Sequence, residues 1–263
     1  MFLKVIKMDI AEISIQLYTA RKFKPYRNIL EFISSLGIKN IELFALAEFD
    51  EKELKDLLQE YNLTSLSSHI NFESFEEVDV ILNKLKYLNI KHAIIPAPKA
   101  IPGKEFEDYF KISEDEWINY AKEISKYIEI LNDNGISLGY HNHSFEFKAL
   151  PNGKYPIEYI LDENENLNFE IDLGWTVAGN ANPIDWIKRY KNQIIACHLK
   201  DFYSDQNMLD HNNQSSIGEG FIDWKELLSK IYETPCEVIA IEHDDPQDYK
   251  QFITKSLDYL SNI

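Results

Sequence analysis

The sequence predicts a single (β/α)8 TIM barrel over residues 1–263, and three observations support this fold class. Eight short runs rich in β-branched residues alternate with longer segments of helical periodicity. Spread over eight units, the 263 residues give about 33 residues per unit, which is the length that a βαβ unit requires. The alternative is a doubly wound open sheet. The segment QLYTARKFKP after the first run lacks the glycines with which such a sheet would bind a dinucleotide.

The expected strands are apolar runs bounded by turn residues. They cover residues 13–18, 40–45, 63–70, 92–97, 136–143, 167–173, 194–200 and 237–243. Helix starts follow from capping signals: Ser74 and Ser113 each precede a glutamate by three residues, which is the spacing of a capping box. Connections are expected to be short except for residues 100–112 and 201–222, and the second of these could close over the mouth of the barrel.

Composition restricts the partners of the chain. The net charge is 27 − 44 = −17, and no run of Lys or Arg suggests a basic patch, so neither nucleic acid nor an anionic membrane surface is an expected partner. No run reaches the ~18 apolar residues of a membrane span, and the start MFLKVIKMDIAEISIQ lacks the core of a signal peptide. Cys197 and Cys236 are expected to be free thiols, and the expected compartment is the cytoplasm.

Polar residues interrupt the strands near their C-terminal ends, although barrel strands are normally apolar on both faces. These residues are Glu42, His69, His141, His143, Asp172, His198, Lys200 and Glu242. In strands 167–173, 194–200 and 237–243, side-chain parity places the apolar residues toward the helices and the polar ones toward the barrel interior. Glu170 shares the inward parity of Asp172. Four consecutive strands therefore direct polar side chains to one point at the barrel mouth.

Burying several charges without a counter-ion costs several kcal/mol for each ion, and a bound divalent cation would offset that cost. A histidine from strand 136–143 together with Asp172, His198 and Glu242 forms a mixed nitrogen and oxygen ligand set. Such a set suits one Mn²⁺, Zn²⁺, Co²⁺ or Fe²⁺ ion, with Mg²⁺ also open, better than Ca²⁺. Taken singly, each residue could instead be a hydrogen-bonded or salt-bridged core group.

Five motifs resemble the sugar phosphate isomerase/epimerase family of the xylose-isomerase-like TIM barrels. They are GYHNHSFEF (139–147), FEIDLGW (169–175), HLKDF (198–202), IGEGFIDW (217–224) and IEHD (241–244). The resemblance implies one divalent metal at the C-terminal mouth, with ligands at the ends of the fifth to eighth strands. Asp172, His198 and Glu242 match the last three ligands. The first ligand is usually a glutamate, and here His141 stands at the matching position.

The resemblance does not decide the roles of the residues that follow His141. His143 falls where some dehydratase relatives keep a catalytic histidine. Glu146 is the nearby carboxylate, but it has the opposite parity unless the strand bulges, so either His141 or Glu146 is the first ligand. Because His141 and His143 share one parity, we expect them to point the same way, about 7 Å apart along the strand.

The leading interpretation is an isomerase or epimerase of a sugar or keto-sugar. The metal would act as a Lewis acid on the carbonyl and stabilise the enediolate, while a base moves the proton of the neighbouring carbon. His143, Glu146 and Glu242 are the candidate bases. Lys200 could neutralise the developing oxyanion, or it could simply form a salt bridge. Substrate contacts are expected from Glu42, His69 and Trp175.

Three other functions remain open. A lyase such as inosose dehydratase would expel water instead of returning the proton, and His143 suits that base. A phosphodiesterase such as endonuclease IV shares the barrel, but a net charge of −17 is unfavourable for DNA. A barrel without metal could only bind sugars. The identity of the sugar, its phosphorylation, the identity of the metal and the possible homo-oligomeric state are not determined by the sequence.

Overall fold

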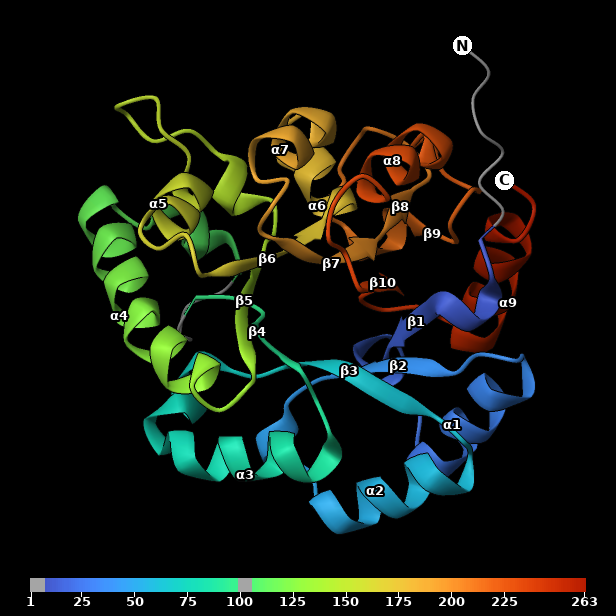
Figure 1. Ribbon diagram of the computed structural model, residues 1–263. Helices are drawn as coiled ribbons and strands as arrows, with labels where there is room; N and C mark the ends of the chain where they lie inside the picture. Colours follow the sequence, from blue (N-terminus) through green and yellow to red (C-terminus); the bar gives the residue numbers. More distant parts are fainter. Residues whose placement is uncertain (1–7, 99–105) are drawn as a thin grey trace.

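Eight parallel strands close into a barrel that is surrounded by helices in the computed structural model, which describes residues 8–98 and 106–263 (Figure 1). The strand order around the barrel is β1-β10-β7-β6-β5-β4-β3-β2, and every neighbouring pair is parallel. This arrangement confirms the predicted (β/α)8 TIM barrel. Two segments discussed above lie partly outside the described residues: the first seven residues of the N-terminal stretch 1–16, and residues 100–105 of the expected loop 100–112.

The barrel strands are shorter than the sequence predicted, mainly at their C-terminal ends. They are β1 (Ile13–Gln16), β2 (Asn40–Leu43), β3 (Thr64–His69), β4 (His92–Ile95), β5 (Ser137–His141), β6 (Asn168–Asp172), β7 (Ile194–Leu199) and β10 (Val238–Ile241). The helices are α1 (Tyr26–Ser35), α2 (Glu51–Glu60), α3 (Val78–Leu88), α4 (Glu114–Asn132), α5 (Pro156–Asp162), α6 (Leu173–Ala178), α7 (Pro183–Arg189), α8 (Trp224–Ile231) and α9 (Tyr249–Leu260).

One of the two predicted capping boxes is present. The Ser113 hydroxyl accepts the N–H of Glu116, and the Glu116 carboxylate in turn accepts the N–H of Ser113 at the start of α4. The prediction for Ser74 is wrong, because this residue lies inside a 3-10 helix, Phe72–Glu77, and α3 begins only at Val78. Phe72 and Phe75 explain the difference: they are three residues apart, which is the 3-10 period, and both are buried.

Strand β5 ends at His141 and not at residue 143, because polar side chains take over the backbone contacts beyond that point. The Asn142 side chain accepts the N–H of Asp172 at 3.0 Å and donates to its carbonyl at 3.2 Å. The N–H of His143 donates to the Glu146 carboxylate at 2.8 Å. The chain therefore turns into a 3-10 helix, Phe145–Phe147, and His143 leaves the strand on which we had expected it.

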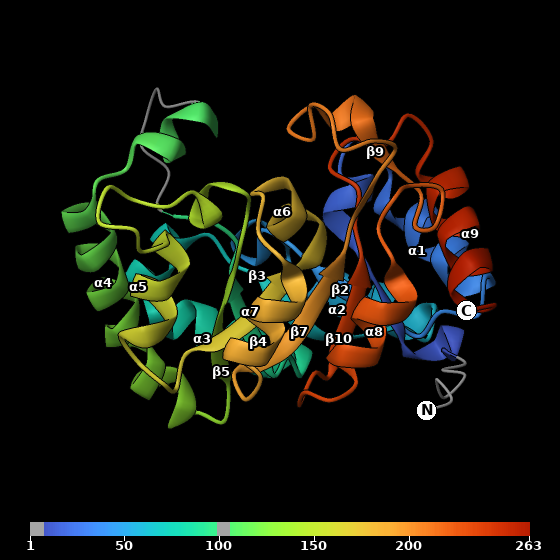
Figure 2. The ribbon, with the colours of Figure 1, turned by 90° about the horizontal axis from the view of Figure 1, so that it is seen from above.

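Residues 201–222 form a folded insertion rather than a plain loop. They contain the antiparallel pair β8 (Asp201–Phe202) and β9 (Gln214–Ser215). The buried Asp201 carboxylate organises this insertion by accepting the N–H of Gly218 at 3.0 Å and the indole N–H of Trp224 at 2.8 Å. In Figure 2 the insertion and the short helix after residue 105 rise from the same end of the barrel.

The apolar core consists of two separate clusters. The large cluster joins buried side chains of the helices to buried side chains of the strands. The small cluster consists of Ile94, Ile195, Ala196, Val238 and Ala240. In the sheet register Ala196 pairs with Glu170 and Ala240 pairs with His198, so these small residues stand beside the inward polar groups. The upper interior of the barrel is therefore free for polar side chains.

Two predictions from composition can be compared with the structure. Cys197 and Cys236 are free cysteines, as expected. Among the helices of residues 8–98 and 106–263, none combines the length and the apolar character needed to cross a bilayer.

A backbone contact at Gly174 provides a test of how closely α6 packs against the end of β7. A Cβ added to Gly174 would lie 2.2 Å from the carbonyl oxygen of Lys200, so the helix would have to move. We expect Gly174→Ala to lower the free energy of unfolding by roughly 1–3 kcal/mol, as overpacking does. Thermal unfolding followed by circular dichroism measures the loss.

Gly139→Ala is the matched control for this substitution. The added Cβ would lie 2.7 Å from Cδ1 of Ile94, the end of a flexible side chain that can rotate away. We expect a smaller loss of stability than for Gly174→Ala. An equal or larger loss for the control would show that the contact between Gly174 and Lys200 does not limit the packing.

Candidate functional site

The four predicted metal ligands meet at the mouth of the barrel. His141 ends β5, Asp172 ends β6, His198 lies near the end of β7, and Glu242 directly follows β10. Asp172 and His198 are register partners, and the N–H of Glu242 continues the sheet by donating to the carbonyl of Leu199. One ligand atom from each of the four residues lies within 4.8 Å of the other three, and all four residues are buried. We call these four residues the outer set.

Each imidazole of the outer set presents one nitrogen to the carboxylates of that set. Nε2 of His141 lies 4.0 Å from Oδ2 of Asp172, and Nδ1 of His198 lies 3.2 Å from Oε2 of Glu242. The opposite nitrogens point away from the set: Nδ1 of His141 lies 2.9 Å from Glu170, and Nε2 of His198 lies 2.5 Å from Glu42. A neutral ring that donates its one N–H to the carboxylate on the far side leaves its other nitrogen with a lone pair for a metal.

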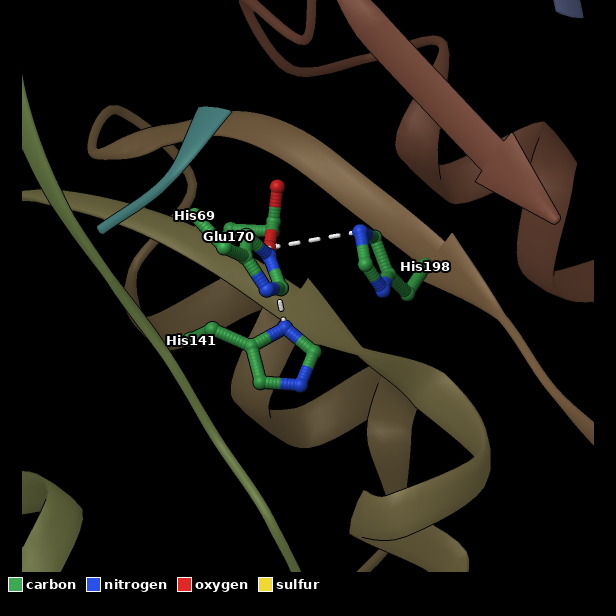
Figure 3. A group of neighbouring side chains, drawn as sticks. All are labelled: His69, His141, Glu170 and His198. Atoms are coloured by element: carbon green, nitrogen blue, oxygen red, sulfur yellow. Dashed lines mark hydrogen bonds and ion pairs between the residues drawn. The ribbon is translucent and has the colours of Figure 1, made fainter. Parts of the chain in front are cut away.

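A second group of four residues, the inner cluster, shares these two imidazoles (Figure 3). It consists of His69, His141, Glu170 and His198. Its centre is Oε2 of Glu170, which lies 2.5 Å from Nε2 of His69, 2.9 Å from Nδ1 of His141 and 3.3 Å from Nε2 of His198. Sequence reasoning did not assign Glu170 to the site, although its position two residues before Asp172 placed it on the same inward face.

Two buried carboxylate oxygens of the site lack a hydrogen-bond partner among the described residues, Oε1 of Glu170 and Oδ2 of Asp172. Asp172 is the one that belongs to the outer set. Its Oδ1 accepts the N–H of Trp175 at 2.7 Å and caps α6, whereas its Oδ2 has no hydrogen-bond partner among the described residues. Burial raises the pKa of this carboxyl to about 7, against the lowering effects of Lys200 and His198. A bound cation stabilises most a buried carboxylate oxygen that lacks a hydrogen bond and lies among imidazole nitrogens and other carboxylate oxygens. The outer set therefore fits a divalent metal.

Charges within the site are strongly coupled. Burial opposes the protonation of His198, but Glu170 and Glu42 outweigh burial and raise the pKa of its imidazole well above the ordinary value. For His141 burial dominates and lowers the pKa to about 4. Burial also disfavours ionised Glu242, yet Lys200 and His198 hold the pKa of that carboxyl well below its ordinary value.

Lys200 forms the salt bridges that the sequence analysis gave as the alternative to an oxyanion role. Its ammonium lies 2.7 Å from Asp244, 3.1 Å from Glu242 and 3.6 Å from Asp172, and 4.7 Å from the ring centre of Trp175. Burial disfavours this charge, but the carboxylates outweigh burial and raise the pKa of Lys200. Asp244 was not foreseen, because it lies in the turn after β10 and carries no strand parity.

A cavity of about 440 Å³ opens above the outer set. Its walls combine aromatic and polar side chains: Tyr18, Phe44, Ala45, Glu48, His69, Asn71, Pro96, Ala97, Phe106, His141, His143, Trp175, His211, Glu242 and Asp244. His69 and Trp175 therefore lie where a substrate contact was expected, and His211 brings the 201–222 insertion to the mouth. Glu42 does not: it is fully buried, lies outside this wall and accepts a hydrogen bond from Gln16.

His143 lies at the cavity next to the outer set. Its ring centre is 5.1 Å from that of His141, and its ring stacks on Phe145. The Nδ1 atom is buried without a hydrogen-bond partner in the part of the chain that the structure describes. Burial is the main cause that lowers the pKa of His143 well below its ordinary value, and His141 and Lys200 lower it further, so the ring is neutral at pH 7. A neutral imidazole at a cavity can accept a proton.

Glu146 lies outside both metal-binding groups. Its carboxylate accepts the hydroxyl hydrogen of Tyr140 at 2.6 Å and the N–H of His143 at 2.8 Å, and burial raises its pKa to about 8. This carboxylate holds the turn after β5. Of the two residues left open by the sequence, His141 is the one that the structure brings to Asp172, His198 and Glu242.

Comparisons with known proteins agree with this architecture. A family model described as xylose isomerase-like TIM barrel matches residues 30–263. A relative named inosose dehydratase, from Clostridium botulinum, is 24% identical over 253 residues, which cover 85% of this chain and 84% of that protein.

Solved structures share the fold over almost the full length of the chain. A sugar phosphate isomerase/epimerase from Parabacteroides distasonis superimposes with a TM-score of 0.77 at 22% identity, covering 97% of this chain and 95% of its own. The IolI protein with a bound zinc atom superimposes with a TM-score of 0.71 at 15% identity, covering 95% and 97%. With the family model matched over most of its length, the chain belongs to the xylose isomerase-like TIM barrel family.

Proposed function

We propose that the chain is an enzyme that holds one divalent metal ion between His141, Asp172, His198 and Glu242 and moves a proton next to the carbonyl of a sugar or keto-sugar. The observation that carries this proposal is Oδ2 of Asp172, a buried carboxylate oxygen without a hydrogen bond from the described residues, within a mixed nitrogen and oxygen ligand set beneath a cavity. The bound zinc of the IolI protein supports a metal in this fold. The identity of the metal stays open among Mn²⁺, Zn²⁺, Co²⁺, Fe²⁺ and Mg²⁺.

The bound ion would supply Lewis acidity toward two adjacent substrate oxygens. The chain supplies the remaining functions. His143 faces the cavity as a neutral imidazole and accepts the proton of the carbon beside the carbonyl. Trp175 and His69 bound the space in which the substrate lies. Lys200, held beside Glu242 and Asp244, adds a fixed positive charge near the developing oxyanion.

Two outcomes of this proton transfer fit the site. Returning the proton gives isomerisation or epimerisation, which is the outcome that the sequence motifs favoured. Expelling a β-hydroxyl as water gives dehydration, and the relatives named inosose dehydratase support this lyase outcome about as strongly. The protonated His143 could serve either outcome, because it can give its proton to carbon or to the departing hydroxyl.

Metal analysis tests the proposed ligands. Because Asp172 and His198 each offer an atom within 4.8 Å of the other ligand atoms, we expect Asp172→Asn and His198→Ala each to abolish stoichiometric metal. The metal content of protein purified without chelator is measured by mass spectrometry. Asp185→Asn, at an exposed position on α7, is the matched control and should retain the wild-type content. Wild-type content in both site variants would place the metal elsewhere.

His143→Ala separates chemistry from metal binding. His143 is outside the outer set, so the variant should keep its metal and its substrate affinity. Removing a general base should lower kcat by roughly 10²–10⁴-fold. Glu146→Gln is the control from the same turn, and we expect only a mild effect on kcat because Glu146 does not line the cavity. Loss of metal from the Glu146 variant with retention in His141→Ala would reverse the ligand assignment.

Incubation with a panel of keto-sugars and keto-polyols in D₂O, read by NMR, identifies the reaction. Proton abstraction predicts deuterium at a single carbon next to the carbonyl. A deuterated product that has otherwise the same composition as the substrate marks an isomerase or epimerase. A new unsaturated product that has lost water marks the lyase. Protein with stoichiometric metal and no exchange in any compound would favour a binding barrel.

The expectations on other partners remain predictions. The cytoplasmic location and the lack of a nucleic-acid partner rest on composition alone, and a homo-oligomer stays possible. With a net charge of −17, we expect no cleavage of abasic duplex DNA at physiological salt. Metal-dependent nicking in a gel assay with pure protein would contradict that expectation.

A further inference from the structure

Glu170 contacts the metal-binding groups without reaching the cavity. It is fully buried in β6, two residues before Asp172, and it does not line the cavity above the outer set. Its Oε2 lies 2.9 Å from Nδ1 of His141, the nitrogen that points away from Asp172. Its place is therefore not explained by contact with substrate. Of its two contacts with the outer set, the one with His141 is the shorter, since Nε2 of His198 lies 3.3 Å away.

The chemistry of imidazole gives that contact a consequence. A neutral ring has one N–H and one lone pair, so the nitrogen that donates a hydrogen bond decides which nitrogen can bind a metal. Carboxylates accept such hydrogen bonds and thereby fix both the tautomer and the ring orientation of metal-binding histidines. With Nδ1–H of His141 directed to Glu170, the lone pair on Nε2 faces Asp172 at 4.0 Å.

We propose that Glu170 is a positioning residue that holds His141 as the Nδ1–H tautomer, with Nε2 turned to the metal site of the outer set. This inference rests on the metal site proposed above. It gives His141 a carboxylate partner on the side away from the metal site, a partner that His141 shares with His69 and His198. His198 shows the same pattern, since its Nε2 lies 2.5 Å from Glu42 while its Nδ1 faces Glu242.

The competing role for Glu170 is that of a metal ligand within the inner cluster. Two ligands of a tetrahedral zinc ion at 2.0–2.1 Å are about 3.4 Å apart. Oε2 of Glu170 is only 2.5 Å from Nε2 of His69 and 2.9 Å from Nδ1 of His141. These are hydrogen-bond separations. The outer set is more open, with 3.2 Å and 4.0 Å between its nitrogen and oxygen pairs. Each group contains one buried carboxylate oxygen without a hydrogen bond from the described residues, Oε1 of Glu170 and Oδ2 of Asp172, so the separations decide between them.

Titration with Co²⁺ tests the positioning role apart from turnover. We expect Glu170→Gln to bind Co²⁺ about 10–100-fold more weakly, the usual effect of losing such a partner. At saturation its visible absorption spectrum should match the wild type, because the ligands themselves are unchanged. His69→Ala should leave the saturated spectrum unchanged for the same reason. Glu158→Gln, a buried glutamate paired with Arg189, is the matched control and should bind as the wild type does.

Either of two results overturns the inference. Wild-type affinity in Glu170→Gln would mean that His141 needs no positioning. An altered saturated spectrum in both Glu170→Gln and His69→Ala would make these residues ligands and place the metal in the inner cluster. If Glu170→Gln does not fold, judged by circular dichroism, the next measurement decides.

Long-range ¹H–¹⁵N NMR of the wild-type protein reads the tautomer of His141 directly, with His141→Ala used for assignment. The expected result is Nδ1–H with a bare Nε2 in metal-free protein, and Nε2 shifted on addition of Zn²⁺. An Nε2–H tautomer would overturn the positioning role. A different result would contradict the proposed function. It is a wild-type protein that binds no stoichiometric metal, and this result does not depend on the tautomer of His141.

Discussion

The structure depends on how five carboxylates are accommodated inside one barrel. Within the described residues these groups are all buried at the upper end of the interior: Glu42, Glu170, Asp172, Glu242 and Asp244. Each ionised carboxylate in such a place costs several kcal/mol unless positive charge or hydrogen-bond donors compensate. Lys200 and three imidazoles provide the compensation, yet Oδ2 of Asp172 and Oε1 of Glu170 still lack a hydrogen bond from the described residues. The contacts among these groups follow from that requirement.

The fold meets this requirement through backbone contacts as well as charges. Asp172 both faces the interior and caps α6 through Oδ1, so the helix fixes the carboxylate that the site uses. Gly174 lets the same helix approach the carbonyl of Lys200, which keeps the ammonium within reach of Asp172. Small residues at Ala196 and Ala240 leave room for the neighbouring polar layer. Stability and site geometry therefore share the same contacts.

The sequence predicted the positions of site residues that lie on strands, where the alternation of side chains determines their direction. It did not predict positions that depend on turns or on hydrogen bonds between distant side chains. Parity along β6, β7 and β10 placed Asp172, His198 and Glu242 together, because alternation is a fixed property of strands. His143 could not be placed this way, since Asn142 and Glu146 end the strand before it. The parity of Glu170 was visible, but its three imidazole partners come from distant strands, and no local pattern shows them.

The separation between strand ends and loops also explains how one site can fit several reactions. The proposed metal ligands come from strand ends, which the closed barrel fixes relative to one another. Much of the cavity wall comes from other segments: Phe106 follows β4, His143 lies in the turn after β5, and His211 belongs to the 201–222 insertion. In barrels of this kind, loops vary while the strands keep their positions. Metal binding would thus be set by the strands. Proton abstraction by His143, and the choice between returning the proton and expelling water, would depend on groups that the turns and loops place beside the substrate.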